Sequence, residues 1–130
     1  MKYLAILPAI IVIAACTLDP DPAEGPTGAE LYATYCAGCH GADATGGDMV
    51  GTTRAANLTT LAARHDGTFP AAYVMSTIDG YAREETHGPM PVFGELLGGE
   101  MGMWEDANGT PTPTPLALIR LAEYLEGLQA

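Results

Sequence analysis

The stretch Cys36-Ala37-Gly38-Cys39-His40 decides how this chain is interpreted. Its C-x-x-C-H spacing lets two thiols add to the two vinyl groups of one haem, and the imidazole next to the second cysteine then lies beneath the iron. The motif therefore predicts one covalently bound haem c. Cys36 and Cys39 would form the thioether bonds, and His40 would be the proximal iron ligand.

Two other chemistries use a C-x-x-C pair. Thiol–disulfide exchange usually occurs in a βαβ setting rich in β-branched strands, and no such pattern flanks this motif. Structural zinc needs two further ligands at suitable spacing. The remaining histidines, His65 and His87, stand alone, and the third cysteine, Cys16, lies near the N-terminus. Haem attachment is the interpretation that we carry forward.

The N-terminus has the features of an export signal. Lys2 precedes an apolar run over residues 4–15, which is too short for an ordinary spanning helix. The run ends in Ala14-Ala15-Cys16, which looks like a bacterial lipobox. We expect residues 1–15 to be a lipoprotein signal peptide and Cys16 to be acylated. The alternatives are an ordinary secretion signal cleaved after Ala15, or a retained anchor.

Export and haem attachment support each other, because bacteria attach haem to C-x-x-C-H motifs outside the cytoplasm. We expect a periplasm-facing protein anchored to the inner or outer membrane. The chain carries a formal charge of −11. Beyond residue 15 it has four arginines against sixteen acidic residues and no lysine, a formal charge of −12. Such a surface repels nucleic acid. It suits a redox partner with a basic docking patch, and solubility in a salty habitat explains it equally well, so charge alone does not identify a partner.

The remaining chain divides into a linker and one domain. Residues 16–26 hold the cysteine and a segment rich in proline and acidic residues, which cannot pack into a core. We expect this segment to act as a tether. Residues 27–130 are long enough for a single domain.

Helix signals open and close that domain. Thr27-Gly28-Ala29-Glu30 fits a capping box, with a helix running from Gly28 into the haem motif. Near the C-terminus, Thr114 could cap a second helix with Pro115 in its first turn. Its apolar stripe has helical spacing and consists of Ala117, Leu121, Tyr124, Leu125 and Leu128.

Weaker patterns lie between these two helices. Residues 70–78 predict a helix that stops near Gly80, and residues 58–64 and 92–97 predict shorter ones. Strand signals are weak, and residues 94–114 are expected to form a surface loop beside the haem edge. This loop would either dock a partner or be a simple insertion. The predicted fold class is all-α, with three to five helices and long loops.

The chain resembles class I c-type cytochromes of the small bacterial mono-haem kind, over about residues 27–130. The resemblance rests on the N-terminal helix, the haem motif, Met90-Pro91 and the C-terminal helix, in that order. It implies a cytochrome c-like fold wrapped around the haem. It also implies that the terminal helices cross closely at Gly28, with Tyr32 packed against Tyr124.

The resemblance makes Met90 the expected distal iron ligand. Prolines on both sides of Met90 stiffen its loop, and a thioether ligand raises the reduction potential. Met101 and Met103 are rivals, and His65 or His87 would give bis-histidine ligation. An open sixth position is the remaining alternative.

The second coordination shell departs from the family pattern. The proximal imidazole usually donates to the carbonyl of a proline soon after the motif, but no proline lies between His40 and Pro70. We expect a carbonyl within residues 46–51 to take this role. The candidates to meet the haem propionates or to line the pocket are Arg54, Asn57, Tyr73, Tyr81 and Trp104.

The expected function is single-electron transfer between membrane-associated partners rather than catalysis. With both axial positions filled, the iron has no vacancy for a substrate. Two alternatives stay open. The chain could be a haem subunit of a larger oxidoreductase, or a protein that binds a gas or peroxide at an open sixth site.

Overall fold

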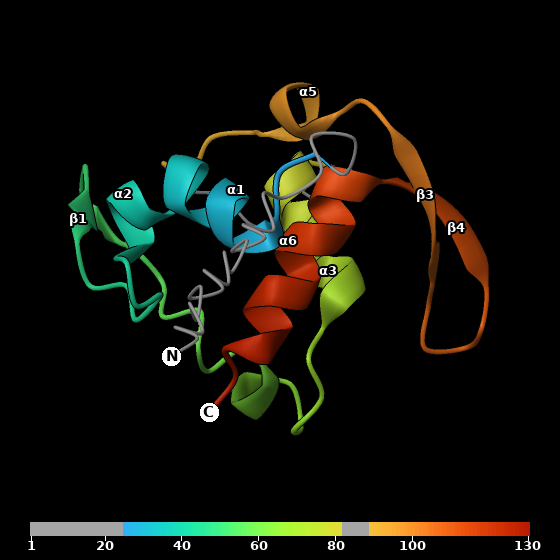
Figure 1. Ribbon diagram of the computed structural model, residues 1–130. Coiled ribbons are helices and arrows are strands. Elements are labelled where there is room, and N and C mark those ends of the chain that lie inside the picture. Colours follow the sequence, from blue (N-terminus) through green and yellow to red (C-terminus); the bar gives the residue numbers. More distant parts are fainter. Residues whose placement is uncertain (1–24, 82–88) are drawn as a thin grey trace, which may run out of the picture.

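The computed structural model describes residues 25–81 and 89–130 (Figure 1). The expectations for Cys16, the signal segment and His87 lie outside these residues. Five α-helices and two hairpins make up the described part, so the mainly helical expectation is confirmed. The elements are α1 (Gly28–Tyr35), α2 (Ala37–His40), β1 (Met49–Val50), β2 (Thr53–Arg54), the 3-10 turn η2 (Ala62–Arg64), α3 (Ala71–Asp79), α5 (Gly94–Leu97), β3 (Met101–Glu105), β4 (Pro111–Pro115) and α6 (Leu116–Gly127).

Helix α1 begins with the predicted capping box. The Glu30 backbone N–H donates to Thr27 Oγ1 at 3.3 Å, and the Thr27 backbone N–H donates to the Glu30 carboxylate at 2.8 Å. These two bonds satisfy donors that the first turn of a helix leaves without partners. The hydrogen bonds from Thr27 hold the pKa of Glu30 below its usual value, so the cap is charged at neutral pH.

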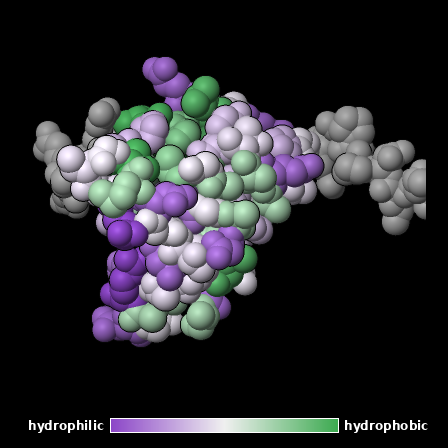
Figure 2. Space-filling model, turned by 90° about the vertical axis from the view of Figure 1, so that its left-hand side faces the viewer, coloured by the Kyte–Doolittle hydropathy of each residue, from purple (hydrophilic) through white to green (hydrophobic). Residues whose placement is uncertain are grey.

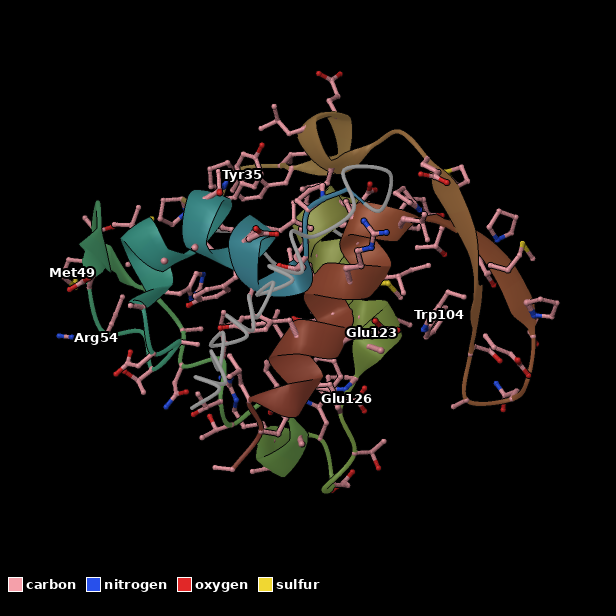
Figure 3. All side chains as sticks on the ribbon, in the orientation of Figure 1. Tyr35, Met49, Arg54, Trp104, Glu123 and Glu126 are labelled. Carbon is pink, nitrogen blue, oxygen red and sulfur yellow. The ribbon has the colours of Figure 1, made fainter. Side chains whose placement is uncertain are left out.

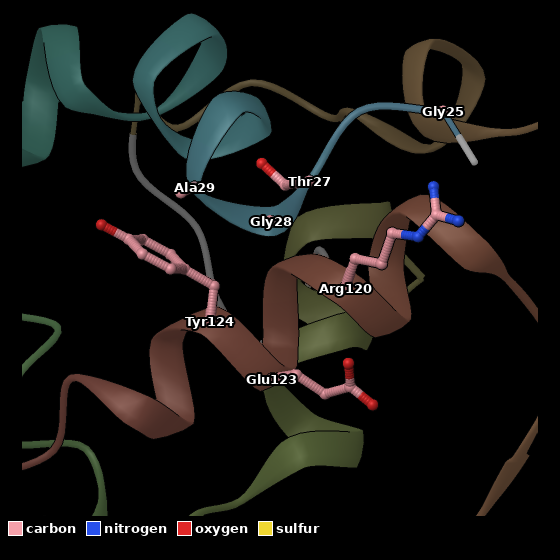
Figure 4. Close-up of a pocket in the computed structure, with 7 residues that line it drawn as sticks. All are labelled: Gly25, Thr27, Gly28, Ala29, Arg120, Glu123 and Tyr124. Carbon is pink, nitrogen blue, oxygen red and sulfur yellow. The ribbon is translucent and has the colours of Figure 1, made fainter. Parts of the chain in front are cut away.

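Helices α1 and α6 cross at Gly28, as the resemblance implied (Figure 4). A Cβ on Gly28 would lie 2.1 Å from the Arg120 carbonyl oxygen and 2.7 Å from Tyr124 Cβ. Only glycine therefore permits this approach. Beside the crossing, the rings of Tyr32 and Tyr124 pack with centroids 5.5 Å apart.

Helix α6 is the centre of the core, because it contacts both α1 and α3. Its Leu121 is fully buried. Around it lie the inward side chains of α3, among them Val74 and Ile78, and Leu97 of α5. The shorter predicted helices are present in reduced form: residues 58–64 contain only the turn η2, and residues 92–97 contain α5.

The expected surface loop over residues 94–114 is wrong. This segment contains α5, β3 and most of β4, and β3 pairs antiparallel with β4 from Met101 opposite Pro115 to Glu105 opposite Pro111. Thr114 is also not the cap of α6, because it belongs to β4 and its hydroxyl donates to the Thr112 carbonyl. Pro115 takes the N-cap position.

The prolines of β4 fit this hairpin because of its hydrogen-bond register. Leu116 donates to Glu100 and Asp106 donates to Thr110, so the hydrogen-bonded pairs include Thr112 and Thr114. Pro111, Pro113 and Pro115 fall in the alternate pairs, where the backbone nitrogen points away from the ladder. Their missing N–H groups therefore cost no ladder bond, and they leave the outer edge of β4 unable to donate to another strand.

Within residues 25–81 and 89–130, none of the helices combines the length and the apolar character needed to cross a bilayer.

Candidate haem site

The cysteine motif lies on a short helix that α1 positions. Helix α1 ends at Tyr35, and Cys36 is both its C-cap and the N-cap of α2. The buried Tyr32 hydroxyl donates to the Gly41 carbonyl at 2.7 Å, which joins α1 to the residue directly after His40. Both ends of the motif are therefore held by α1.

The imidazole of His40 is oriented by a backbone carbonyl, but not by the expected one. Its Nδ1 lies 2.9 Å from the Ala56 carbonyl oxygen, sixteen residues along the chain. The expectation of a carbonyl within residues 46–51 is thus wrong. When Nδ1 donates to Ala56, Nε2 carries the lone pair that a metal ligand needs.

The β1–β2 hairpin explains why Ala56 arrives beside His40. Gly46 donates to the His40 carbonyl at 2.8 Å, the chain then turns through β1 and β2, and Ala55 donates to the Asp48 carbonyl. Gly46 has φ of +70°, and a Cβ there would lie 2.4 Å from the Ala56 oxygen. Glycine is required at this position because any side chain would displace the carbonyl that orients His40.

A cavity of about 400 Å³ opens next to the motif, and Cys36, Cys39 and His40 line it. Its walls are mainly apolar and come from the η2 segment, α3 and α6, with Leu58, Leu61, Val74, Ile78 and Leu125 among the lining residues.

The face of the molecule that carries β1, β2 and α2 is drawn in Figure 2. Hydrophobic residues gather mostly in its upper part, and hydrophilic residues form a band along its lower left margin.

Met90 lines the same cavity as His40. Pro89 and Pro91 line it as well, so the stiff segment around Met90 forms part of the wall. Phe93 follows and packs against Tyr35, with ring centroids 6.3 Å apart, which ties the segment to α1. The structure thus brings together the two cysteines, the histidine and the methionine that the sequence singled out.

The rival ligands lie in different places. Met101 and Met103 are exposed on β3 and do not line the cavity. His65 does line it, with Nδ1 2.8 Å from the Leu61 carbonyl oxygen and its ring packed against Tyr73.

Of the residues expected to meet the haem propionates or to line the pocket, some line the cavity and others do not. Arg54 and Tyr73 line the cavity. Asn57 uses its side chain to accept from Thr59, Tyr81 is 89% exposed, and Trp104 packs at the edge of the core.

The sequence reasoning missed Arg64, a second cation in the cavity wall. Its Nη2 donates to the Asn57 carbonyl at 2.6 Å, and Arg54 donates through Nη1 to the Gly47 carbonyl. Neither guanidinium has a carboxylate among its hydrogen-bond partners in the described part of the chain. The sequence did hold one indication of Arg64: only four arginines and no lysine follow residue 15 in this strongly acidic chain, so each positively charged residue is a candidate to contact the haem carboxylates.

The Cys36 thiol is not activated for disulfide exchange. Cys36 and Cys39 are not bonded to each other. Burial, and then the neighbouring Cys39, raise the pKa of Cys36 to about 11, so its thiol is protonated at neutral pH. A cysteine that carries out disulfide exchange needs a lowered pKa, because the thiolate is the reactive form.

The residues present fit a covalently bound haem. Two thiols, an imidazole held through Nδ1 and a soft thioether line the same cavity, and Nε2 is the nitrogen of that imidazole left for a metal. The walls are apolar enough to exclude water from a macrocycle, and two guanidiniums at the wall could balance its carboxylates.

Comparison with protein families gives one match. The family described as Cytochrome C oxidase, cbb3-type, subunit III matches residues 23–104, which include the cysteine motif and Met90. No curated protein and no solved structure matches the chain. Because the family match covers more than half of the sequence, the chain belongs to this cbb3-type subunit III family of c-type cytochrome domains, with covalently bound haem c and an electron-transfer function.

Proposed function

We propose that the protein is a single-electron carrier in which His40 and Met90 would be the iron ligands of one haem, and Cys36 and Cys39 would form its thioether bonds. The observation that carries the proposal is that all four side chains line one apolar cavity, with His40 already oriented by Ala56. Bound haem c supplies a one-electron ferric/ferrous couple.

The chain's own residues provide ligation, exclusion of water and charge balance. The Ala56 carbonyl accepts a hydrogen bond from His40 Nδ1, which keeps Nε2 available as the iron-binding nitrogen. Leu61, Val74 and Ile78 are buried in the wall and keep water away. The soft sulfur of Met90 favours the reduced metal, which raises the reduction potential relative to a harder ligand.

The test is the absorption spectrum of the purified haem-loaded protein, oxidised and reduced. We expect a low-spin spectrum with the weak iron–sulfur charge-transfer band, and we expect Met90→Ala to abolish that band. Met101→Ala and Met103→Ala are the matched controls, because both methionines are exposed on β3, and these variants should keep the band. A band that survives in Met90→Ala contradicts the ligand assignment.

Carbon monoxide separates this proposal from an open sixth site. A reduced wild-type protein with both axial positions filled should bind carbon monoxide slowly, whereas Met90→Ala should bind it rapidly. Rapid binding by the wild-type protein, together with a high-spin spectrum, would instead support a gas-binding or peroxide-binding role.

The proposal includes a tether at Cys16 that holds the domain on the extracytoplasmic side of a membrane. It is supported by the lipobox-like sequence and by the proline- and acid-rich segment that follows it. The expected result is recovery of the full-length chain in the membrane fraction, and release of a haem-loaded Cys16→Ser variant into the soluble fraction. Acylation is checked by the mass of the mature N-terminal peptide.

The family match favours a second candidate function, that of a haem subunit within a membrane oxidase complex. The two functions differ in what a mild detergent extracts. A free carrier leaves the membrane as an isolated lipoprotein, and a subunit leaves it together with other polypeptides.

A further inference from the structure

The β3–β4 hairpin has one face that packs on the body and one that does not. Gly102 and Trp104 face inward: a Cβ on Gly102 would lie 2.5 Å from Leu116 Cδ2, and Trp104 packs on the core. Because side chains alternate along a strand, the intervening residues face outward. We call this the outer hairpin face; it consists of Met101, Met103, Pro111 and Pro113, and Glu105 lies at its end next to the tip.

The outer hairpin face is apolar and well exposed. Met101 is 54% exposed and Met103 is 65% exposed. Prolines lie directly across the ladder from both methionines. Methionine is flexible and polarizable, and proline is rigid, so the combination suits contact with another protein surface.

The tip of the hairpin is held in one conformation by hydrogen bonds. The Asp106 carboxylate accepts the backbone N–H groups of Asn108 and Thr110, each at 2.8 Å. The bond from Thr110 contributes most to lowering the pKa of Asp106 below its usual value, so this carboxylate stays charged. A partner would therefore meet a surface that is already ordered.

The charged residues in and next to the hairpin along the chain are acidic. Residues 89–119 contain no lysine, arginine or histidine, and they hold Glu95, Glu100, Glu105 and Asp106. A second copy of this chain would bring the same charges together, and anionic headgroups would also be repelled. The complementary surface is apolar at its centre and basic at its rim.

The hairpin does not border the haem cavity in the described part of the chain. In Figure 1 it extends from one side of α6, while α2 and β1 lie on the other side. Figure 3 shows Trp104 and the pair Met49 and Arg54 at opposite sides of the molecule. No described residue of β3 or β4 lines the cavity.

We propose that the outer hairpin face binds a protein subunit whose contact surface is apolar and rimmed by lysine or arginine. Such a contact holds the cytochrome in place and leaves the haem cavity free to exchange electrons elsewhere. The proposal rests on the second candidate function, that of a subunit within a membrane complex, and does not depend on Met90 as an iron ligand.

Cross-linking of carboxylates to lysines can test this proposal, because no lysine follows residue 15. In a chain that has lost residues 1–15, a zero-length carbodiimide cross-link between a carboxylate of the domain and a lysine must therefore join it to another polypeptide, and cross-linked peptides that contain Lys2 are excluded from the count. In native membranes that contain the full chain, we expect such cross-links to map to Glu100 and Glu105 and to disappear at high salt. Cross-links that map only to Glu123 and Glu126 on α6 would overturn the proposal.

Variants provide a second readout. In mild detergent, the wild-type cytochrome should migrate on a haem-stained native gel within a larger assembly. The double variant Met101→Glu/Met103→Glu should migrate as the isolated chain, and Met49→Glu, at a methionine 57% exposed on β1, should remain in the assembly. If the double variant loses haem, the variant Glu100→Lys/Glu105→Lys is used instead, and it should also migrate as the isolated chain. Wild-type migration at the size of the isolated chain, or variants that stay assembled, would show that this face is not a docking site.

Discussion

The hydroxyl of Tyr32 donates a hydrogen bond of 2.7 Å to the backbone carbonyl of Gly41, the residue that follows His40. Tyr32 is 2% exposed, and its ring also packs against Tyr124 of α6. One side chain thus connects the crossing of the terminal helices with the end of the haem motif. Disturbing the crossing should therefore also disturb the site.

Replacing Tyr32 by Phe should make the protein less stable at neutral pH and less sensitive to alkali. The lost hydrogen bond costs about 1 kcal/mol of unfolding free energy, because it leaves a part-buried carbonyl without its donor. In the wild-type protein, burial contributes most to raising the pKa of Tyr32 from 10.0 to about 12. Since the folded state holds this proton more tightly, the associated stability is present below pH 10 and is lost as the pH rises toward 12.

Urea unfolding of the haem-loaded protein between pH 8 and 12 measures this effect. The wild-type unfolding free energy should fall more steeply above pH 10 than that of Tyr32→Phe. Tyr81→Phe is the control, because Tyr81 is 89% exposed, and its profile should follow the wild type. Parallel profiles for wild type and Tyr32→Phe would contradict the assigned pKa shift.

Replacing Gly28 by Ala should destabilise the fold by about 1–3 kcal/mol, as overpacking of a close contact does. The new methyl group would meet backbone atoms of Arg120, which have no room to move. Gly127→Ala is the matched control, because a Cβ on Gly127 meets nothing within 4 Å. Thermal unfolding should separate the two variants, and equal midpoints would show that the crossing can open at no cost.

The parts of the fold that the sequence predicted correctly depend on local signals or on the family resemblance. The capping box at Thr27 and Glu30 acts within one helical turn, so it was visible in the sequence. The resemblance added the approach at Gly28 and the contact between Tyr32 and Tyr124. The placement of Met90 in the cavity agrees with the predicted site, although its bond to iron stays a prediction.

The parts that the sequence did not predict depend on register and on long-range contacts. Prolines usually argue against a strand, and in β4 only the alternation of the ladder makes Pro111 and Pro113 acceptable. The carbonyl that orients His40 comes from Ala56, because the β1–β2 hairpin shortens the path between them. Neither relationship is visible until the strands are paired.

Removing the cations of the cavity wall should lower the reduction potential. A positive charge near the iron disfavours the ferric state, so Arg54→Gln and Arg64→Gln should each shift the midpoint potential downward. Arg120→Gln is the matched control: it removes the same charge from α6, where Arg120 donates to the Pro26 carbonyl away from the cavity. Redox titration at low and moderate salt measures the shifts.

The effect of the two cavity arginines should exceed that of Arg120 and should weaken with added salt, because both side chains are exposed. Equal shifts in all three variants would mean that only net charge matters, and that Arg54 and Arg64 have no particular relation to the haem.

Gln129 should contribute to the haem environment although it does not line the cavity. Its Nε2 donates to the Leu58 carbonyl at 2.9 Å and to the Leu125 carbonyl, and its Oε1 accepts from Ala62 at 2.9 Å. These bonds fasten the segment that carries Leu58 and Leu61 to the end of α6. The wall of the cavity is thereby held against the core.

Gln129→Glu keeps the shape of the side chain but places a carboxylate oxygen opposite two carbonyls. It should destabilise the protein by about 1–3 kcal/mol, because the donors are lost and like partial charges face each other. It should also loosen the wall and admit water, so the reduction potential should fall as well. Glu126→Gln, an exposed neighbour on α6, should change neither quantity by a comparable amount. A Gln129→Glu protein that loses stability but keeps its potential would show that the contact supports the fold without shaping the haem cavity.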